Sequence, residues 1–240
     1  MSTEYIVGTS GWHYDHWRDR FYPRSLPKSR WLEFYAQHFR AVEINNTFYH
    51  LPSEKAFSNW YDKSPEGFIF AIKASRVITH YRKLRNVEEP LSRLLEHARP
   101  LKEKQGPILY QLPPSLDRDE SLLEEFTSAL PPGFLHVVEF RHRSWYDERV
   151  FDILRHHQTG YCVISRPHFE SPFKVTAPFA YIRFHGSAAL YAGSYSHAEL
   201  DRWARRIREE ARDAEQVFAF FNNDAEANAV FNAQELIAKL

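Results

Sequence analysis

Eight short apolar runs, separated by longer segments with helical periodicity, constrain the fold of this chain more than any other feature. Each run has four to six residues and is rich in β-branched and aromatic side chains. Runs of this length and composition are typical of strands that are buried on both faces. The runs cover residues 5–9, 41–44, 68–73, 108–111, 135–140, 161–164, 180–184 and 217–221.

Most of the segments between these runs are predicted to be helices with one buried face. Leu91, Leu94, Leu95 and Ala98, for example, follow the spacing i, i+3, i+4, i+7. Comparable stripes run through residues 31–38, 122–130, 150–154, 200–211 and 225–240. Residues 165–178 contain three prolines and no stripe, so we predict that a loop replaces the helix after the sixth strand.

Small polar residues mark where the helices should begin. Ser53 precedes the segment 54–63, and Ser121, Ser196 and Asp224 stand at the starts of three later segments. Side chains of this kind accept hydrogen bonds from the free amides of a first helical turn. We therefore expect these four residues to be N-caps.

Strict alternation of strands and helices predicts a parallel sheet. The alternatives are a closed eight-stranded (β/α)₈ barrel of the TIM type, usually about 250 residues long, and an open doubly wound sheet. The count of eight strands favours the barrel, formed by one domain over residues 1–240. The first strand–helix turn, Gly8 to Trp12, matches neither a dinucleotide fingerprint nor a phosphate loop.

Composition excludes several classes of protein. The 31 basic and 31 acidic residues give zero net charge, which argues against a surface wholly devoted to nucleic acid but leaves a local basic cleft open. The single cysteine, Cys162, permits no internal disulfide. No apolar run approaches the roughly 18–20 residues of a membrane span, and the N-terminal segment has no basic start. We expect a cytoplasmic protein with no membrane partner.

Charged residues inside apolar strands point to the site. Glu43, Lys73, Glu139 and Arg183 each lie within a predicted strand, where a charge is costly unless it is paired or solvated. A structural ion-pair network would explain any one of them. Charges from four strands that meet at one barrel end are more typical of a catalytic site, because catalytic groups gather at the C-terminal ends of barrel strands. The predicted catalytic residues are Glu43, Lys73, His80, Glu139 and His185.

The predicted ligand is an anionic small molecule. Arginine and lysine bind phosphate and carboxylate, and carboxylates and imidazoles transfer protons. We assign the role of general base to Glu43 or Glu139, and that of acid to His80 or His185. Backbone amides near Asp224 are a further candidate for binding an anion. The predicted substrate-binding residues are Trp12, Tyr14, Asn45, Gln111, Arg141, Arg183, Tyr191, Asn222 and Asn223.

No cofactor is predicted from a motif. The sequence has no nucleotide-cofactor fingerprint and no His-Glu-x-x-His pair on a helix. A divalent metal held by scattered ligands such as Glu43, Glu139, His185 and Asp224 stays open. Cys162 lies in an apolar strand and is interpreted as a small buried residue.

Several motifs resemble those of the YecE-like family, also called domain of unknown function 72. They occur in order along almost the whole chain, from residue 8 to residue 233, and several are long. The resemblance implies a (β/α)₈ barrel and a site at its mouth, and it supplies no reaction. The motifs include GTSGW at 8–12, VEINNTFY at 42–49, FAIK at 70–73, QLPP at 111–114, VEFRH at 138–142, RFHG at 183–186 and FNND at 221–224.

Three functional hypotheses remain. The first is an enzyme, of hydrolase or lyase type, that acts on an anionic small molecule by acid–base chemistry. The second is a nucleic-acid-processing enzyme of nuclease or repair type, in which loop aromatics stack on bases. The third is a non-catalytic protein that binds a metabolite. A fold alone does not choose among them.

Overall fold

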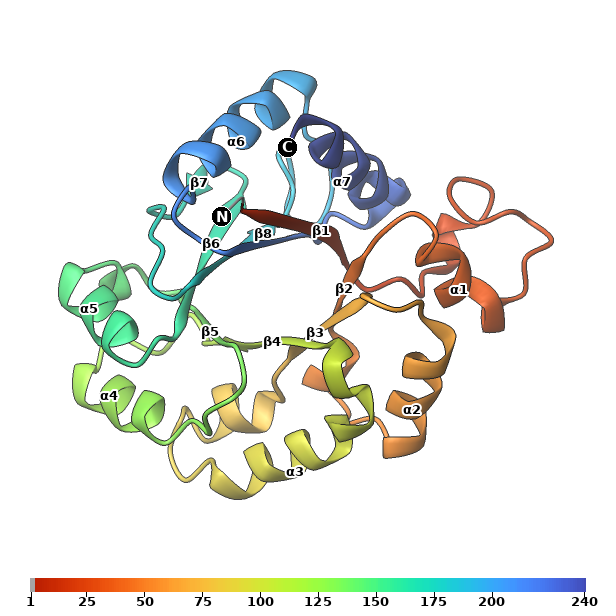
Figure 1. The fold of residues 1–240 in the computed structure, drawn as a ribbon. Coiled ribbons are helices and arrows are strands. Elements are labelled where there is room, and N and C mark those ends of the chain that lie inside the picture. The colour runs from red at the N-terminus through yellow and green to blue at the C-terminus, as the bar shows by residue number, and fades with distance from the viewer. Residues whose placement is uncertain (1–2) are drawn as a thin grey trace.

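The computed structural model describes residues 3–240, and the first two residues of the N-terminal segment lie outside it. Nine strands form one sheet in the order β5-β4-β3-β2-β1-β9-β8-β6-β7. Strands β5 and β6 also pair with each other, so that eight parallel strands close into a barrel. Figure 1 looks into this barrel and shows the helices around its outside. The predicted (β/α)₈ architecture is confirmed.

Each of the eight predicted strands is present, with ends that differ by a few residues. The ninth, β7, is a two-residue strand that runs antiparallel to β6. The strands are β1 (Glu4–Ser10), β2 (Ala41–Ile44), β3 (Ile69–Lys73), β4 (Gln105–Gln111), β5 (His136–Glu139), β6 (Gly160–Arg166), β7 (Phe169–Glu170), β8 (Phe179–Phe184) and β9 (Gln216–Phe221).

Among residues 3–240, seven α-helices cover the barrel. Between β6 and β8 the chain forms only β7 and irregular backbone in residues 167–178, which confirms the predicted loss of a helix there. A short π-helical turn, η4 (Val77–Tyr81), follows β3. The helices are α1 (Trp31–Tyr35), α2 (Glu54–Lys63), α3 (Glu88–Ala98), α4 (Glu120–Ser128), α5 (Glu148–His156), α6 (His197–Glu210) and α7 (Asn228–Lys239).

Two of the four predicted N-caps are confirmed. The Ser53 hydroxyl accepts from the amide of the third helical residue, and Ser196 forms a capping box with Glu199. The prediction of Ser121 as an N-cap is wrong. The N-cap of α4 is Asp119, which lies in extended backbone and whose carboxylate accepts from Leu122 N at 2.9 Å.

Asp224 is wrong as the cap of the last helix. It precedes a 3₁₀ turn, η7 (Ala225–Ala227), and makes no side-chain capping bond there. Ala227, with a left-handed backbone, separates this turn from α7, which begins at Asn228. The amides that we expected near Asp224 are therefore not the N-terminus of a continuous helix.

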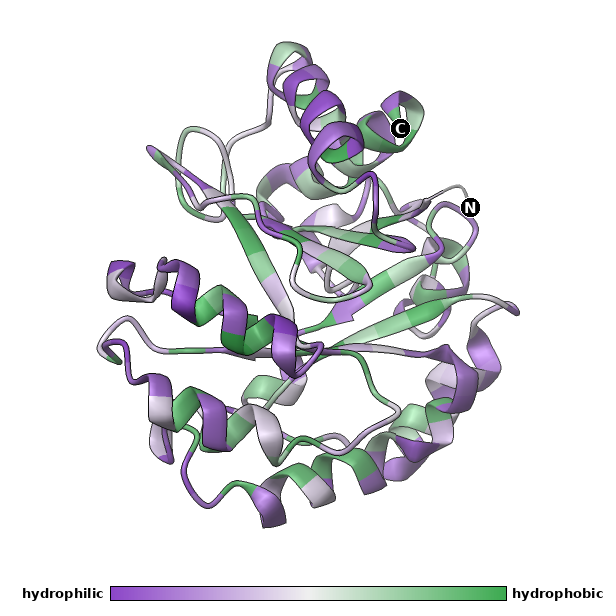
Figure 2. Cartoon of the chain, turned by 60° about the vertical axis from the view of Figure 1, so that its left-hand side comes forward, coloured by the Kyte–Doolittle hydropathy of each residue, from purple (hydrophilic) through white to green (hydrophobic). Residues whose placement is uncertain are grey.

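Alternation along the strands divides the apolar core in two. Residues such as Ala71, Val137 and Phe218 form one cluster inside the barrel, and their neighbours Phe70, Val138 and others pack outward against the helices. The helices present apolar stripes toward the strands and polar stripes outward (Figure 2). Successive strand residues point to opposite faces, so residues two positions after an interior one again face the barrel axis.

This alternation brings the site residues together. Glu43 follows the interior residue Ala41 by two positions, Lys73 follows Ala71, and Arg183 follows Tyr181. Because all eight strands are parallel, these last inward positions share one barrel end. In residues 3–240, no helix is both long and apolar enough to cross a membrane.

Close packing of β1 against β2 yields a stability prediction. Gly8 pairs with Ala41, and a Cβ at Gly8 would overlap the Ala41 carbonyl oxygen and lie 3.2 Å from the Tyr35 hydroxyl. We expect Gly8→Ala to lower the free energy of unfolding by about 2–3 kcal/mol through overpacking. Urea unfolding monitored by circular dichroism measures this loss.

Gly67→Ala is the matched control. Gly67 has φ +74° and no atom within 4 Å of the added Cβ, so only backbone strain of about 1 kcal/mol is expected. An equal loss in the two variants would contradict the overpacking argument.

Candidate functional site

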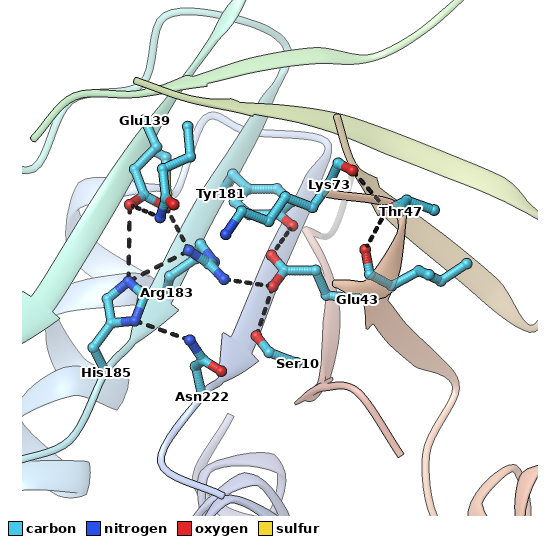
Figure 3. Close-up of polar contacts among 12 residues, drawn as sticks. Ser10, Glu43, Thr47, Lys73, Glu139, Tyr181, Arg183, His185 and Asn222 are labelled. Carbon is cyan, nitrogen blue, oxygen red and sulfur yellow. Dashed lines mark hydrogen bonds and ion pairs between the residues drawn. The ribbon is translucent and has the colours of Figure 1, made fainter. Parts of the chain in front are cut away.

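Arg183 lies between two glutamates at the C-terminal end of the barrel. Its Nη2 donates to Glu43 Oε1 and its Nη1 donates to Glu139 Oε2, each at 2.7 Å. All three side chains are fully buried. Figure 3 shows the guanidinium between the two carboxylates, which come from β2 and β5, on either side of β8. Three of the four charged strand residues therefore form one bridged unit.

Both oxygens of Glu43 have further partners. The Ser10 hydroxyl donates to Oε1 at 2.6 Å, and the Tyr181 hydroxyl donates to Oε2 at 2.6 Å. With Arg183 on Oε1 as well, the carboxylate accepts three hydrogen bonds. It is held in one orientation and has no face open to solvent.

Glu139 is enclosed in the same way. Gln111 Nε2 donates to its Oε1 at 2.8 Å, and Arg141 Nε donates to the same oxygen. Burial alone would raise the pKa of Glu139, but the charges of Arg141 and Arg183 outweigh it and hold the pKa well below its ordinary value. Burial raises the pKa of the neighbouring Cys162 thiol well above its ordinary value. Cys162 is thus an inert buried residue, as its sequence position indicated.

His185 joins the unit through Arg141. Its Nε2 lies 3.1 Å from Arg141 Nη2, and its Nδ1 lies 3.2 Å from the Asn222 amide. Burial, with the charges of Arg183 and Arg141, holds the pKa of His185 well below its ordinary value. The ring is therefore neutral at pH 7. Because a guanidinium only donates, Nε2 accepts the hydrogen bond from Arg141.

Lys73 is a cation without a carboxylate partner. Its Nζ makes no hydrogen bond or ion pair within residues 3–240 and lies 4.2 Å from the centre of the Phe48 ring. Burial, and next the charge of Arg183, lower the pKa of Lys73 to about 8. The side chain extends from β3 across the barrel end toward Arg183 (Figure 3). Its backbone carbonyl accepts from the Thr47 hydroxyl at 2.6 Å, which fixes the end of the strand.

A cavity of about 230 Å³ opens above this network. Gln111 and Arg141 belong to its wall and also bind Glu139. His80, on the π-helical turn η4, is another wall residue, and its pKa is lowered by burial and by the charges of Lys73 and Arg141. The lining residues are His80, Gln111, Leu112, Pro114, Arg141, Arg166 and Tyr191.

The remaining predicted residues lie elsewhere. Trp12, Tyr14 and Asn45 line a second cavity of about 290 Å³ beside the ends of β1 and β2. Asn223 donates to Gly193 O at 2.8 Å and to Asn232 Oδ1 at 2.9 Å, which ties the loop after β8 to α7. The predicted site residues thus fall into three groups. Most belong to the central charged cluster and the cavity beside it, Trp12, Tyr14 and Asn45 line a second cavity, and Asn223 has a structural role.

Comparison with known proteins places this architecture in a family. Residues 6–240 match the model of a family described as "Protein of unknown function DUF72". The chain is a member of the DUF72 family. The DUF72 protein of Thermotoga maritima MSB8, known from a crystal structure, superposes with a TM-score of 0.88 at 30% identity over 98% of each chain.

Two curated DUF72 relatives bear names without a function. The UPF0759 protein YunF of Bacillus subtilis (strain 168) is 23% identical over 98% of this chain and 94% of its own length. The UPF0759 protein YecE of Escherichia coli (strain K12) is 33% identical over 48% of this chain and 43% of its own. The resemblance predicted from motifs is confirmed, and it leaves the activity to be inferred from the site.

Sequence reasoning missed two partners of Glu43. Ser10 was only one of several polar residues at the end of its strand, and Tyr181 reads as an ordinary aromatic residue of an apolar run. Tyr181 stands two residues before Arg183, so both face the barrel interior. That spacing was the signal that would have found it.

A metal site at this end of the barrel is not supported by the donor set. The oxygens of Glu43 and Glu139 are already occupied by cationic or hydroxyl donors. Within residues 3–240, the one group of three metal-ligating side chains within 4.8 Å lies on the outside of the barrel. It is formed by Glu124 on α4, His156 at the end of α5, and His157 directly after it.

The bridged unit predicts unequal losses of stability when Glu43 and its partner Tyr181 are substituted. We expect Glu43→Gln to lower the free energy of unfolding by about 3–5 kcal/mol, because it removes one carboxylate from the buried Arg183. Tyr181→Phe removes one hydrogen bond to a charged group and should cost about 1.5–3 kcal/mol. Urea midpoints at pH 7 compare the variants. A wild-type midpoint for Glu43→Gln would show that Arg183 does not depend on it.

The neutral His185 predicts a loss of stability in acid. Its pKa is lowered in the folded state, so below about pH 6.5 the unfolded chain takes up a proton that the folded chain refuses. Stability should therefore fall between pH 6.5 and pH 5, by up to about 1.4 kcal/mol per pH unit from this residue. We expect His185→Gln to have a shallower dependence of unfolding free energy on pH. His156→Gln, on the exposed side of α5, should keep the wild-type slope, and a wild-type slope in His185→Gln would contradict the assignment.

Proposed function

We propose that this end of the barrel binds a small molecule bearing a phosphate or carboxylate and performs acid–base chemistry on it. The observation that carries the proposal is the excess of positive charge around the cavity. The two buried carboxylates, Glu43 and Glu139, are matched by the guanidiniums of Arg183 and Arg141. Lys73 is then an additional cation with no anionic partner among residues 3–240. An anionic ligand would supply that partner.

Arg141 and Arg166 are the proposed anion contacts. Arg141 uses Nε for Glu139 and Nη2 for His185, which leaves Nη1 for a ligand. Arg166 also lines the cavity, and its guanidinium lies 4.7 Å from the centre of the Phe169 ring. The cavity of about 230 Å³ is small beside the roughly 300–1,000 Å³ of drug-sized sites. It suits a metabolite of a few carbons.

Proton transfer is proposed for His80 and Lys73. His80 lines the cavity and has a lowered pKa, so the ring is neutral near pH 7 and ready to accept a proton. Lys73, with a pKa of about 8, exchanges a proton in the same range. Glu43, Glu139 and His185 are fully buried. In this proposal they are positioning residues that hold Arg141 and Arg183 in place.

A nucleic-acid substrate is the second candidate, and one observation favours it. Two tyrosines at the rim, Tyr49 and Tyr81, are 58% and 65% exposed. The Arg76 guanidinium lies 5.7 Å and 5.4 Å from their ring centres. Exposed aromatic rings beside a cation are suited to stacking on unpaired bases.

Anion binding gives the first test of the proposal. Inorganic phosphate, phosphate esters, sugar acids and nucleotides are titrated into the protein at low salt and followed by calorimetry. For whichever compound binds, we expect Arg166→Gln to weaken binding by about 10- to 100-fold, since a charge-assisted hydrogen bond contributes about 1.5–3 kcal/mol. This variant leaves the Glu139 network intact.

Lys174→Gln is the matched control. Lys174 does not line the cavity, and its ammonium lies 2.9 Å from the carboxylate of Glu148. Its affinity should equal that of the wild type. Failure of every anion to bind, or equal binding by Arg166→Gln, would contradict the proposal. Binding of a single-stranded oligonucleotide that weakens steeply with salt would favour the second candidate. Binding without turnover of any anion would indicate a binding protein.

A further inference from the structure

Lys73 differs from the other interior lysine of this chain. Lys104 is buried, and its ammonium donates to Tyr61 O and Ser64 O at 2.7 Å and to Ser64 Oγ at 3.0 Å. Such saturation is the usual way to bury an ammonium. Lys73 Nζ has no such acceptor within residues 3–240, and it lies against Phe48.

The surroundings of Lys73 favour the neutral amine. Burial and the charge of Arg183, with a smaller effect of Arg141, lower the pKa of Lys73 and outweigh the opposite effect of Glu139 and Glu43. The amine lies 4.2 Å from the centre of the Phe48 ring. His80 contacts the same ring, with ring centres 5.0 Å apart. A lysine that is desolvated beside other cations is a nucleophile near neutral pH.

We propose that Lys73 forms a Schiff base with the carbonyl group of a small ketone or aldehyde that also carries a carboxylate or phosphate. The inference rests on the proposed function, because Arg141 and Arg166 would hold the anionic group while Lys73 attacks the carbonyl carbon. It names the substrate class of that site as a keto acid, an aldehyde acid or a phosphorylated carbonyl compound.

The step balances without any further reactant. The lysine ammonium first gives one proton to a neighbouring base, for which His80 is placed. The amine lone pair then forms a bond to the carbonyl carbon, and the carbonyl oxygen takes a proton to give a carbinolamine. Loss of that oxygen as water, with a second proton, leaves a protonated imine. One ammonium and one carbonyl thus become one iminium and one water.

Charge placement explains why such an imine would be useful here. The iminium keeps the positive charge that Lys73 carried, so the balance of the Glu43, Glu139 and Arg183 unit does not change when the imine forms. An iminium also withdraws electrons from the neighbouring carbon atom. A proton or a carbon–carbon bond at that atom then becomes easier to remove, which is the acid–base chemistry proposed above.

Reductive trapping tests the inference. The full-length protein is incubated at pH 7.5 with glyoxylate, an anionic aldehyde, and sodium cyanoborohydride, and the modified lysines are identified by peptide mass spectrometry. The hydride adds to the imine carbon and leaves a stable secondary amine. We expect Lys73 to be modified at least 10-fold faster than Lys104. Lys104 is the matched control, since it is buried but hydrogen-bonded.

A parallel reaction with formaldehyde, which has no anionic group, distinguishes the reactivity of the amine from the effect of the anion site. A preference of Lys73 for glyoxylate over formaldehyde, relative to the exposed Lys63, supports the inference. Equal relative rates with the two aldehydes would overturn the anionic substrate class and count against the proposed function too. Failure of both aldehydes to modify Lys73, with anion binding intact by calorimetry, would overturn the Schiff base alone. Lys73→Arg, which keeps the charge, should fold normally and lose the adduct.

Discussion

The bridge from Arg183 to Glu43 and Glu139 determines how this barrel end is organised. It links β2 and β5 through β8, and both of its carboxylates bind further polar side chains. Ser10 and Tyr181 fix Glu43, while Gln111 and Arg141 fix Glu139. The carboxylates therefore support the cations nearer the cavity, and are not themselves presented to a ligand. Removing one partner of such a unit leaves a buried charge without compensation.

Much of the fold follows from local patterns in the sequence. Runs of four to six apolar residues predicted all eight barrel strands, and the prolines of residues 165–178 predicted the missing helix. The least successful predictions concern helix starts. Asp119 and Ser121 both satisfy the residue preference for an N-cap, and the choice between them depends on which backbone is extended. That conformation is set by packing, which a residue type does not encode.

The sequence predicted which charged residues form the site, but it did not predict which of them pair with one another. Parallel strands bring Glu43, Lys73, Glu139 and Arg183 to one end, and the sequence shows this directly. Distances across the barrel decide which cations form ion pairs with the carboxylates. The spacing of these residues along the chain does not contain that information. The exposure of the aromatic side chains likewise depends on packing across the fold. Trp17 and Trp145 are fully buried, whereas Tyr49 and Tyr81 are exposed at the rim.

Stability alone does not account for the charged layer at this end of the barrel. Deeper layers of the barrel are filled by residues such as Ala71, Val137 and Phe218, and apolar side chains of similar volume would also fill its mouth. A buried ion-pair network is often no more stable than its apolar replacement. The network holds Arg141 beside a cavity, which an apolar layer cannot do. In the proposed function, the anionic group of a bound carbonyl compound would supply the negative partner that Lys73 lacks among residues 3–240.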